Sequence, residues 1–474
     1  MERFDAVVVG SGPNGLAAAI TFAEAGRSVV LLEANDTIGG AARTAELTLP
    51  GFQHDLASAI HTMGRASPFF RTQPLEDHGI RWIDPPAAAA HPLDDQPAGI
   101  AWNDLDAAAD RLGADASAYR RYYSRWVDRF EAVTDLALNP LLRVPPNPLL
   151  AARFGAMSAL PAATTARREF DTAAGQALFA GHAAHSILPL TSPFTSSFGL
   201  LLGASVHAIG WPFPEGGAQA ISDALASRLR ELGGEVRTDT PVHSMADIPS
   251  SDAVVFALTP RQVVDIAGDE FPDRYRSSLH RFTYGAAAWK VDWALREPIP
   301  WADPDVASAA TVHLGGTLDE IVAAEAEVAA GRNPDRPFVL LAQQSLFDPT
   351  RAPGGQHTAW AYCHVPNGST VDRTEAIESQ IERFAPGFRD LVLERHVTSP
   401  AGLEAQNMNL VGGDVGGGSF AGTQLFFRPR VQANPWTTPN PRLFIGSAST
   451  APGSAVHGMA GHGAARRALS TTLK

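Results

Sequence analysis

The sequence predicts an α/β fold that opens with a strand, a glycine-rich turn, a helix and a second strand. Residues 6–9 form a short apolar run with the length of a buried strand. The turn Gly10-Ser-Gly-Pro-Asn-Gly15 follows at once and leads into a small-residue helix that stops at Gly26. Residues 28–32 predict the second strand, which is apolar from Val29 on and is followed by Glu33. This order of elements is typical of a dinucleotide-binding unit.

The glycines of this turn suit a bound pyrophosphate. Gly10 allows the sharp turn, Gly12 puts no side chain between its backbone and a phosphate, and Gly15 lets the helix lie close to the strand. The free amides at the helix start attract an anion, and the carboxylate of Glu33 can accept both hydroxyls of an adenosine ribose. An ordinary βαβ unit, with glycines that serve only the turn, is the alternative. We expect nucleotide contacts from Gly10, Gly12, Pro13, Asn14, Gly15, Glu33 and Ala34.

The composition excludes several classes of protein. The chain has 474 residues, 45% of them hydrophobic, so two or three domains with a large core are expected. The net charge of −13 argues against a nucleic-acid partner. Cys363 is the only cysteine, which excludes an intramolecular disulfide and paired-cysteine redox chemistry. We find no signal peptide and no run of ~18 apolar residues, so we expect a cytoplasmic protein without a transmembrane segment, with contact to a membrane surface left open.

A second glycine-rich loop, Gly39-Gly40-Ala41-Ala42-Arg43, follows the ribose acid. Arg43 would be a fixed cation beside a phosphate, which it can bind with two parallel hydrogen bonds. A surface arginine after a turn is the alternative. The loop resembles the second fingerprint of the flavoprotein superfamily that includes amine oxidases and phytoene desaturases. That resemblance implies that its amides and arginine hold the cofactor pyrophosphate.

The next segment resembles the same superfamily. Residues 50–59 match its pattern G-F-x-x-D-x-G/A, which runs under the flavin ring. The resemblance implies flavin contacts from Ala57 and Ser58. His54 and His61 are polar candidates nearby, and a purely structural histidine is the favoured alternative for each.

The middle of the chain predicts an inserted helical cap at about residues 104–190. Residues 105–133 have a helical pattern, and residues 136–160 are apolar and interrupted by prolines that forbid one long helix. Such a cap is either an apolar lid, which touches a membrane or admits a lipid-like substrate, or only a connection between domains. His182 and His185 share one helix face and could begin a metal site, but without a third ligand we expect core or pocket-wall histidines and no metal.

From Pro214-Glu-Gly-Gly217 the chain returns to the nucleotide domain. Residues 221–232 predict an amphipathic helix, and residues 235–238 and 252–259 predict strands. This block resembles the second conserved region of the superfamily, which implies that the backbone of Val242 meets the adenine end of the cofactor.

Residues 276–420 predict a mixed, strand-rich substrate domain. Strand alternation over residues 286–295 could point Lys290 inward, and some amine oxidases hold a lysine near the reactive edge of the flavin. A cross-domain ion pair or an exposed lysine is the favoured alternative. Residues 338–341 and 358–364 predict further strands. The glycine-rich residues 411–418 lack the following helix and acid of a second dinucleotide turn, so we expect no built-in NAD(P)H domain.

The C-terminal block makes the resemblance specific. A short strand at residues 443–445 ends at Gly446, and a small-residue helix opens after His457-Gly458. With the earlier motifs, the chain resembles the phytoene desaturase-like FAD oxidoreductases, in the branch related to carotenoid ketolases and the pyridine nucleotide-disulphide oxidoreductase domain 2 protein. The resemblance implies cofactor contacts from Gly446, Ser447, Val456, His457, Gly458 and Met459, with a helix dipole that stabilises reduced flavin.

The resemblance also implies the domain organisation. A Rossmann-like FAD-binding domain would combine residues 1–65, 214–275 and 421–474. A mixed α+β substrate-binding domain with the helical cap would combine residues 66–213 and 276–420.

The leading functional expectation is a desaturase-type FAD dehydrogenase or oxidase. It would move a hydride between an apolar substrate, such as a carotenoid, isoprenoid, lipid-like molecule or natural-product precursor, and flavin N5, with oxygen or a quinone as electron acceptor. His54, His457 and Lys290 are the candidate catalytic side chains. A flavin amine or amino-acid oxidase and a non-catalytic, FAD-stabilised binding protein are the alternatives.

Overall fold

The computed structural model describes residues 2–140 and 143–474, and it contains two large sheets. The first sheet has five parallel strands in the order β16-β10-β1-β2-β9. This Rossmann-like sheet confirms the predicted α/β class. Its strands come from the two ends and the centre of the chain: β1 Arg3–Val9, β2 Val29–Leu32, β9 Glu235–Arg237, β10 Ser250–Phe256 and β16 Leu443–Ile445.

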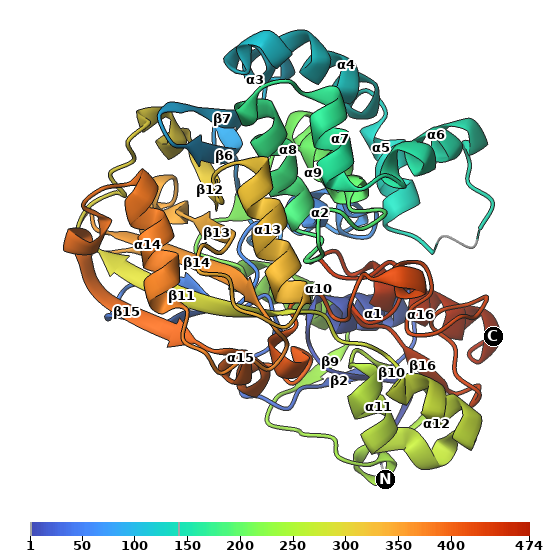
Figure 1. The fold of residues 1–474 in the computed structure, drawn as a ribbon. Helices are drawn as coiled ribbons and strands as arrows, with labels where there is room; N and C mark the ends of the chain where they lie inside the picture. Colours follow the sequence, from blue (N-terminus) through green and yellow to red (C-terminus); the bar gives the residue numbers. More distant parts are fainter. Residues whose placement is uncertain (1, 141–142) are drawn as a thin grey trace.

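Helices cover both faces of this sheet (Figure 1). On one face α1 (Pro13–Glu24) packs between α10 (Gln219–Glu231) and α16 (Met459–Thr471). On the other face α11 (Pro260–Ala267) and α12 (Asp273–His280) close a separate apolar cluster. The predicted strand at 252–259 ends earlier, at Phe256, because Thr259 caps α11 instead.

The second sheet has seven strands in the order β15-β11-β14-β13-β12-β6-β7. It is mixed, since β12 pairs with β6 in parallel and the other neighbours are antiparallel. The strands are β6 Ala87–Leu93, β7 Gln96–Trp102, β11 Ala287–Leu295, β12 Ala309–Leu314, β13 Val339–Ala342, β14 His357–Val365 and β15 Val392–Thr398. One face packs on α14 (Thr374–Phe384), whereas α13 (Leu318–Ala329) and the helical cap lie over the other.

Seven α-helices between β7 and β8 form the cap above the sheets (Figure 1). They are α3 Leu105–Arg111, α4 Ala116–Val127, α5 Phe130–Ala137, α6 Pro148–Ser158, α7 Ala162–Glu169, α8 Ala173–Ala184 and α9 Ser196–Ile209. The helices thus continue past residue 190, because α9 packs on α4 and α8. Two residues of the apolar stretch, Leu141 and Leu142, lie outside the described part of the chain.

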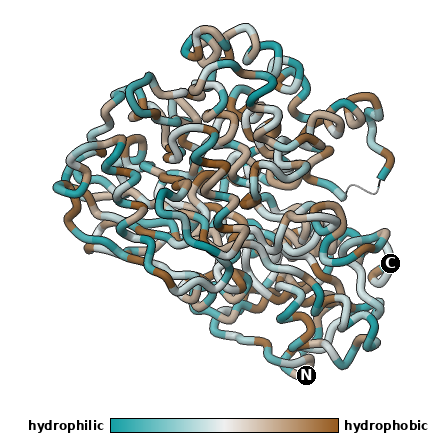
Figure 2. Tube along the Cα trace, in the orientation of Figure 1, coloured by the Kyte–Doolittle hydropathy of each residue, from teal (hydrophilic) through white to brown (hydrophobic). Residues whose placement is uncertain are grey.

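Short elements join these parts. They include the strand pairs β3 (Thr44–Glu46) with β4 (Gln53–Asp55) and β5 (Trp82–Ile83) with β8 (Phe213–Pro214), and the helices α2 (Thr62–Ala66) and α15 (Pro400–Gln406). Figure 2 shows apolar residues concentrated in the interior, where one core cluster runs from the parallel sheet into the cap. Within the described residues no helix has the length and apolarity needed to cross a membrane.

The glycine-rich residues 411–418 form a loop, in agreement with the rejection of a second dinucleotide turn. Asp414 organises this loop, because its carboxylate accepts hydrogen bonds from the amides of Gly285, Gly416 and Gly418. The loop begins with a short 3-10 turn at Val411–Gly413, and no α-helix follows before α16 in this described stretch.

Candidate cofactor and substrate site

Two helix N-termini meet at the carboxyl end of β1. Helix α1 begins after Gly12 and α16 begins after Gly458. Gly461 on α16 lies so close to Asn14 that an added Cβ would sit 1.7 Å from the Asn14 carbonyl oxygen. A glycine at position 461 therefore brings the two helix starts together, and their combined dipoles favour a negatively charged ligand there.

The space beside the Cα of Gly12 is almost free of neighbouring atoms. A Cβ added to Gly12 would have one neighbour within 4 Å, the Cα of Gly40 at 3.9 Å. Gly40 takes a left-handed conformation with φ +57°, which lets its loop pass beside Gly12. Both predicted phosphate loops thus flank one open space, and the space fits a pyrophosphate.

Arg43 is a buried cation without an ion pair in the described structure. Its side chain is 8% exposed and donates to the carbonyl oxygens of Gly40, at 3.0 Å, and Gln406, at 2.5 Å. Burial lowers the pKa of Arg43, and the charges of Glu33 and Asp36 oppose this effect. A buried guanidinium beside the Gly12 space is suited to an anionic ligand.

The carboxylate of Glu33 already has four protein donors. One oxygen accepts from the amide and hydroxyl of Ser11, and the other accepts from the amide and side chain of Asn35. These bonds fill its usual acceptor capacity. Ribose hydroxyls would therefore have to replace the two side-chain donors, which can rotate away, whereas the two backbone donors are fixed.

Except for Val242, the remaining predicted cofactor residues lie on the cavity side of the parallel sheet or at its carboxyl edge. Ala41, Ala57, Ser58 and Val456 line a large cavity. Ser447 and Met459 are buried beside β16 and in α16, and a Cβ at Gly446 would collide with Ala464 of α16. Val242 is half-buried against the cluster on the far face of the parallel sheet. Pro13, Ala34, Gly39 and Ala42 belong to the first turn, the end of β2 and the second loop.

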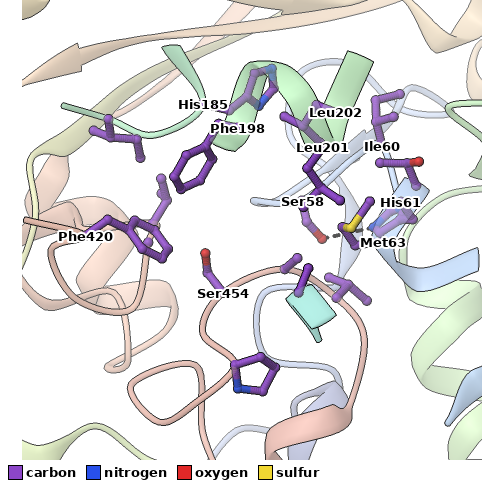
Figure 3. A pocket seen from close by; sticks show the side chains of 18 of the residues that line it. Ser58, Ile60, His61, Met63, His185, Phe198, Leu201, Leu202, Phe420 and Ser454 are labelled. Carbon is purple, nitrogen blue, oxygen red and sulfur yellow. Dashed lines mark hydrogen bonds between the residues drawn. The ribbon is translucent and has the colours of Figure 1, made fainter. Parts of the chain in front are cut away.

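The cavity has a volume of about 530 Å³ and lies between the parallel sheet, the mixed sheet and the cap. Figure 3 shows His185, Phe198, Leu201 and Leu202 of the cap at its edge, with Ser58, His61 and Met63 nearby and Phe420 and Ser454 across from them. Most of the lining is apolar, and Lys290 is the one charged residue among the described residues that line it.

Lys290 is buried in the cavity wall and is not exposed, contrary to the favoured expectation. It is 2% exposed, and its Nζ pairs with the carboxylate of Asp292, which is fully buried. The pair lies within strand β11, so it is not a cross-domain ion pair either. Alternation of side chains places residues 290 and 292 on the same face of the strand, which explains the pairing.

His54 extends this polar group away from the cavity. Its Nδ1 lies 3.6 Å from the second oxygen of Asp292, and its Nε2 shares a 2.8 Å hydrogen bond with Thr48 Oγ1. Desolvation lowers the pKa of His54 to about 3, helped by the positive charges of Lys290 and Arg351. His54 is therefore neutral at physiological pH and touches Asp292 instead of the cavity.

His457 and His61 have different surroundings. His457 is fully buried, its Nδ1 accepts from the amide of Met459, and desolvation lowers its pKa to about 4. It thus supports the start of α16 and is not among the cavity-lining residues. His61 lines the cavity, and its Nε2 shares a 3.1 Å hydrogen bond with Ser58 Oγ.

Two aromatic residues of the site were missed in the sequence. Trp360 and Tyr362 line the cavity from β14, with stacked rings 5.6 Å apart. The strand sequence HTAWAYCHV carries the signal, because its large polar aromatics alternate with small residues. As expected, His182 lies in the core and His185 in the cavity wall. In the described residues no group of His, Cys, Asp or Glu is arranged for a metal.

A parallel sheet with two helix N-termini at its carboxyl edge is the arrangement of a dinucleotide-binding domain. A model of the NAD(P)-binding Rossmann-like domain matches residues 8–73. Cyclohexylamine oxidase from Brevibacterium oxydans has the same fold, with a TM-score of 0.60 and 16% identity over 98% of each chain.

The amino-acid sequence of the chain is also similar to those of named relatives. The chain is 26% identical to pyridine nucleotide-disulfide oxidoreductase domain-containing protein 2 of Rattus norvegicus, over 98% of this chain and 93% of the relative. It is 25% identical to the neurosporene-forming phytoene desaturase of Rhodobacter capsulatus, over 57% and 56% of the two chains. These similarities confirm the resemblance inferred from the motifs.

Proposed function

We propose that this chain binds FAD and oxidises or reduces an apolar substrate held in the 530 Å³ cavity. The observation that carries the proposal is the continuity of the cavity wall. Ala57, Ser58 and Val456, the residues expected at the flavin ring, line the same cavity as Phe198 and Leu201 of the cap. A substrate in contact with the cap would therefore also reach the flavin side. The phytoene desaturase relative supports an apolar substrate.

The cofactor would lie along the open space over Gly12. Arg43 and the amides at the starts of α1 and α16 would hold its pyrophosphate, and Glu33 would hold its ribose. When bound, FAD supplies a two-electron acceptor for a hydride. Oxygen or a quinone would serve as the final electron acceptor in this proposal.

The protein's own part is to bind the substrate, exclude water and handle one proton. In a desaturation, the carbon beside the hydride donor must lose a proton. Asp292 is a buried base next to the cavity, and burial raises the pKa of its carboxyl group despite the opposing charge of Lys290. Lys290 lines the cavity, and its Nζ donates to Asp292 Oδ2. Lys290 would pass one of its own protons to Asp292 and take up the proton from the substrate carbon in its place.

The amine-oxidase alternative is less well supported by the geometry. An aromatic surface for a substrate ammonium exists in Trp360 and Tyr362, but Nζ of Lys290 lies 5.8 Å from the Trp360 ring. That position repels a second cation. The carboxylate of Asp292 is also already paired, so it offers no free counterion.

The test is anaerobic reduction of the bound flavin. Purified FAD-loaded protein is mixed with isoprenoid alcohols, carotenoids and a panel of amines, and loss of the flavin band near ~450 nm is followed. We expect bleaching by an apolar compound and none by amines. Bleaching by amines alone would establish the alternative oxidase. A dithionite-reduced flavin that neither oxygen nor a quinone reoxidises would instead indicate a non-catalytic binding protein.

Cofactor binding is tested separately at Glu33. Glu33→Gln keeps the shape but weakens every hydrogen bond the carboxylate accepts, so FAD should be retained less tightly by ~1–2 kcal/mol. The neighbouring Asp36→Asn, at an exposed position, is the matched control. Equal FAD dissociation constants for the wild type and Glu33→Gln would refute the ribose role.

We also propose that the protein is cytoplasmic and binds at the surface of a membrane. The cap presents exposed apolar residues near the cavity, with Val144 89% and Leu149 63% exposed. Phe154, Gly155 and Ser158 of α6, the helix that carries Leu149, line the cavity. An apolar substrate could thus pass from a membrane surface into the cavity beside α6.

A further inference from the structure

One end of the cavity carries polar atoms that the proposed redox chemistry does not use. Thr311 lies on β12 and lines the cavity, and its buried Oγ1 has no hydrogen-bond partner in the described structure. Residue 313, two positions further on β12, is a histidine on the same face of the strand. A buried hydroxyl without a partner is unfavourable, which points to a ligand atom beside it.

His313 fixes the protonation of His185. The two Nε2 atoms are 3.0 Å apart, so one ring donates a proton and the other accepts it. Nδ1 of His313 faces Gly181, where an added Cβ would lie 2.6 Å away, and this nitrogen has no partner in the described residues. The position of Nδ1 is therefore closely packed against the backbone of Gly181, where an unpartnered lone pair needs less room than an N–H group. His313 therefore donates from Nε2, and His185 carries its own proton on Nδ1.

His185 accordingly offers a donor at the wall of the same cavity that Thr311 lines. Both residues line the cavity, and Figure 3 shows His185 at its edge beside Phe198 and Leu202. Desolvation lowers the pKa of His185 to about 3 and holds that of His313 well below its usual value. The donor pair is therefore uncharged at physiological pH.

The polar pair lies far from Lys290. Strand order places β14 and β13 between β11, which carries Lys290, and β12, which carries Thr311. Neighbouring strands are ~4.8 Å apart, so the two residues are separated by roughly 14 Å. Tyr362 and Leu340 occupy the row between Lys290 and His313.

We propose that the substrate is an elongated apolar molecule with an uncharged oxygen group, a carbonyl or a hydroxyl, that binds between His185 Nδ1 and Thr311 Oγ1. This inference rests on the proposed function, because it assumes that the cavity holds the substrate. The apolar body would extend past Leu340 towards Lys290, where the redox step occurs. A pure hydrocarbon would leave both polar groups without a hydrogen-bond partner and without water. A carboxylate would find no positively charged side chain at this end of the cavity.

Four related ligands test the inference: farnesene, farnesol, farnesal and farnesoic acid. Their dissociation constants are measured on the FAD-loaded protein by tryptophan fluorescence, since Trp211 and Trp360 line the cavity. We expect farnesol and farnesal to bind about five- to tenfold more tightly than farnesene, the size of one net hydrogen bond. Farnesoic acid should bind more weakly than both.

Two variants remove the polar pair, and one serves as a control. In Thr311→Val and in His185→Leu the preference for farnesol over farnesene should fall to about twofold or less, with farnesene affinity nearly unchanged. Thr398→Val makes the same change at another buried threonine of this sheet, which is outside the cavity lining and also unpartnered, and it should keep the preference.

The outcomes separate this inference from the proposed function. Equal affinity of the wild type for farnesene and farnesol, or tightest binding of farnesoic acid, overturns the inference and leaves the apolar cavity intact. A preference that survives in Thr311→Val and His185→Leu does the same. Failure of every ligand to bind overturns the apolar-substrate proposal and this inference together. Because Val has the shape of Thr, Thr311→Val decides the question even if His185→Leu does not fold.

Discussion

Lys290 and Asp292 form a buried ion pair between two residues of one strand, and Lys290 lines the cavity. Lys290 is 2% exposed and Asp292 is fully buried. They stand directly opposite Tyr362 and Trp360 on the neighbouring strand β14. The opposite face of β11 is apolar, with Val291 and Trp293 in a separate core cluster. The other residues of β11 are apolar, so this buried charged pair is the part of the strand that the proposed proton transfer would use.

Removing one partner of this pair should be far worse than removing both. Lys290→Met leaves a buried carboxylate without a counterion, with an expected loss of ~3–5 kcal/mol in the free energy of unfolding. The double variant Lys290→Met with Asp292→Leu should regain most of that loss. Chemical denaturation of the two single variants and the double variant measures the coupling. Additive losses would contradict a direct ion pair.

Replacement by leucine should cost much more stability at one buried arginine, Arg351, than at the other, Arg43. Arg351→Leu leaves Asp55 and Asp348 without their shared cation, which lies 3.1 and 3.0 Å from them, and should cost ~3–5 kcal/mol of stability. Arg43→Leu removes a cation without an ion pair in the described structure, so the FAD-free protein should change by less than ~1 kcal/mol.

FAD binding should separate the two variants further. Arg43→Leu should weaken FAD binding by ~1.5–3 kcal/mol through loss of a charge-assisted hydrogen bond. Calorimetry of the FAD-free protein and titration with FAD check both quantities. Unchanged FAD affinity in Arg43→Leu would remove Arg43 from the phosphate site.

The first sixty residues could be predicted because their conformation is local. Glycines set the two turns, and the apolar runs set the strands that flank them. The strand β6 could not be predicted in this way, since it begins with four alanines, Ala87 to Ala90, which favour a helix. Pairing with β12 and β7 overrides that preference.

The side chains that the site residues contact could not be predicted from the sequence either. Alternation could place Lys290 on the inner face of its strand, but burial was needed to show that Asp292 is its counterion. The contact of His185 with His313 joins α8 to β12, 128 positions apart, and no local pattern encodes it. Motifs with fixed spacing can be recognised in a sequence, whereas contacts between distant elements cannot.

Buried histidines should make the protein sensitive to acid. Desolvation lowers the folded-state pKa of His61, His91, His207, His457 and His462 to about 4. The unfolded value is ~6.5, so between these values the unfolded chain binds protons that the folded chain does not. Stability is therefore fully present above pH ~6.5 and falls as the pH drops towards 4, by ~1.4 kcal/mol per pH unit for each histidine.

A pair of variants isolates this effect. His462→Gln removes one half-buried histidine whose pKa is lowered, and His280→Gln removes an exposed one. Denaturant midpoints between pH 4.5 and 6.5, a window set by ~4 and ~6.5, should show a shallower pH slope only for His462→Gln. Equal slopes in both variants would show that other groups cause the acid sensitivity.

The exposed apolar residues of the cap should mediate contact with a membrane surface. Val144 and Leu149 are exposed, and α6, which carries Leu149, also lines the cavity. Replacing both with serine should reduce co-sedimentation with phospholipid vesicles, because each buried apolar side chain contributes ~1.5–3 kcal/mol. Val371→Ser, at a 49% exposed valine outside the cap, is the matched control and should sediment like the wild type. The same double variant should turn over a water-soluble substrate analogue normally but extract an apolar substrate from vesicles more slowly. Equal vesicle binding by the wild type and the double variant would leave α6 as a connection between domains, and the substrate would then enter from solution.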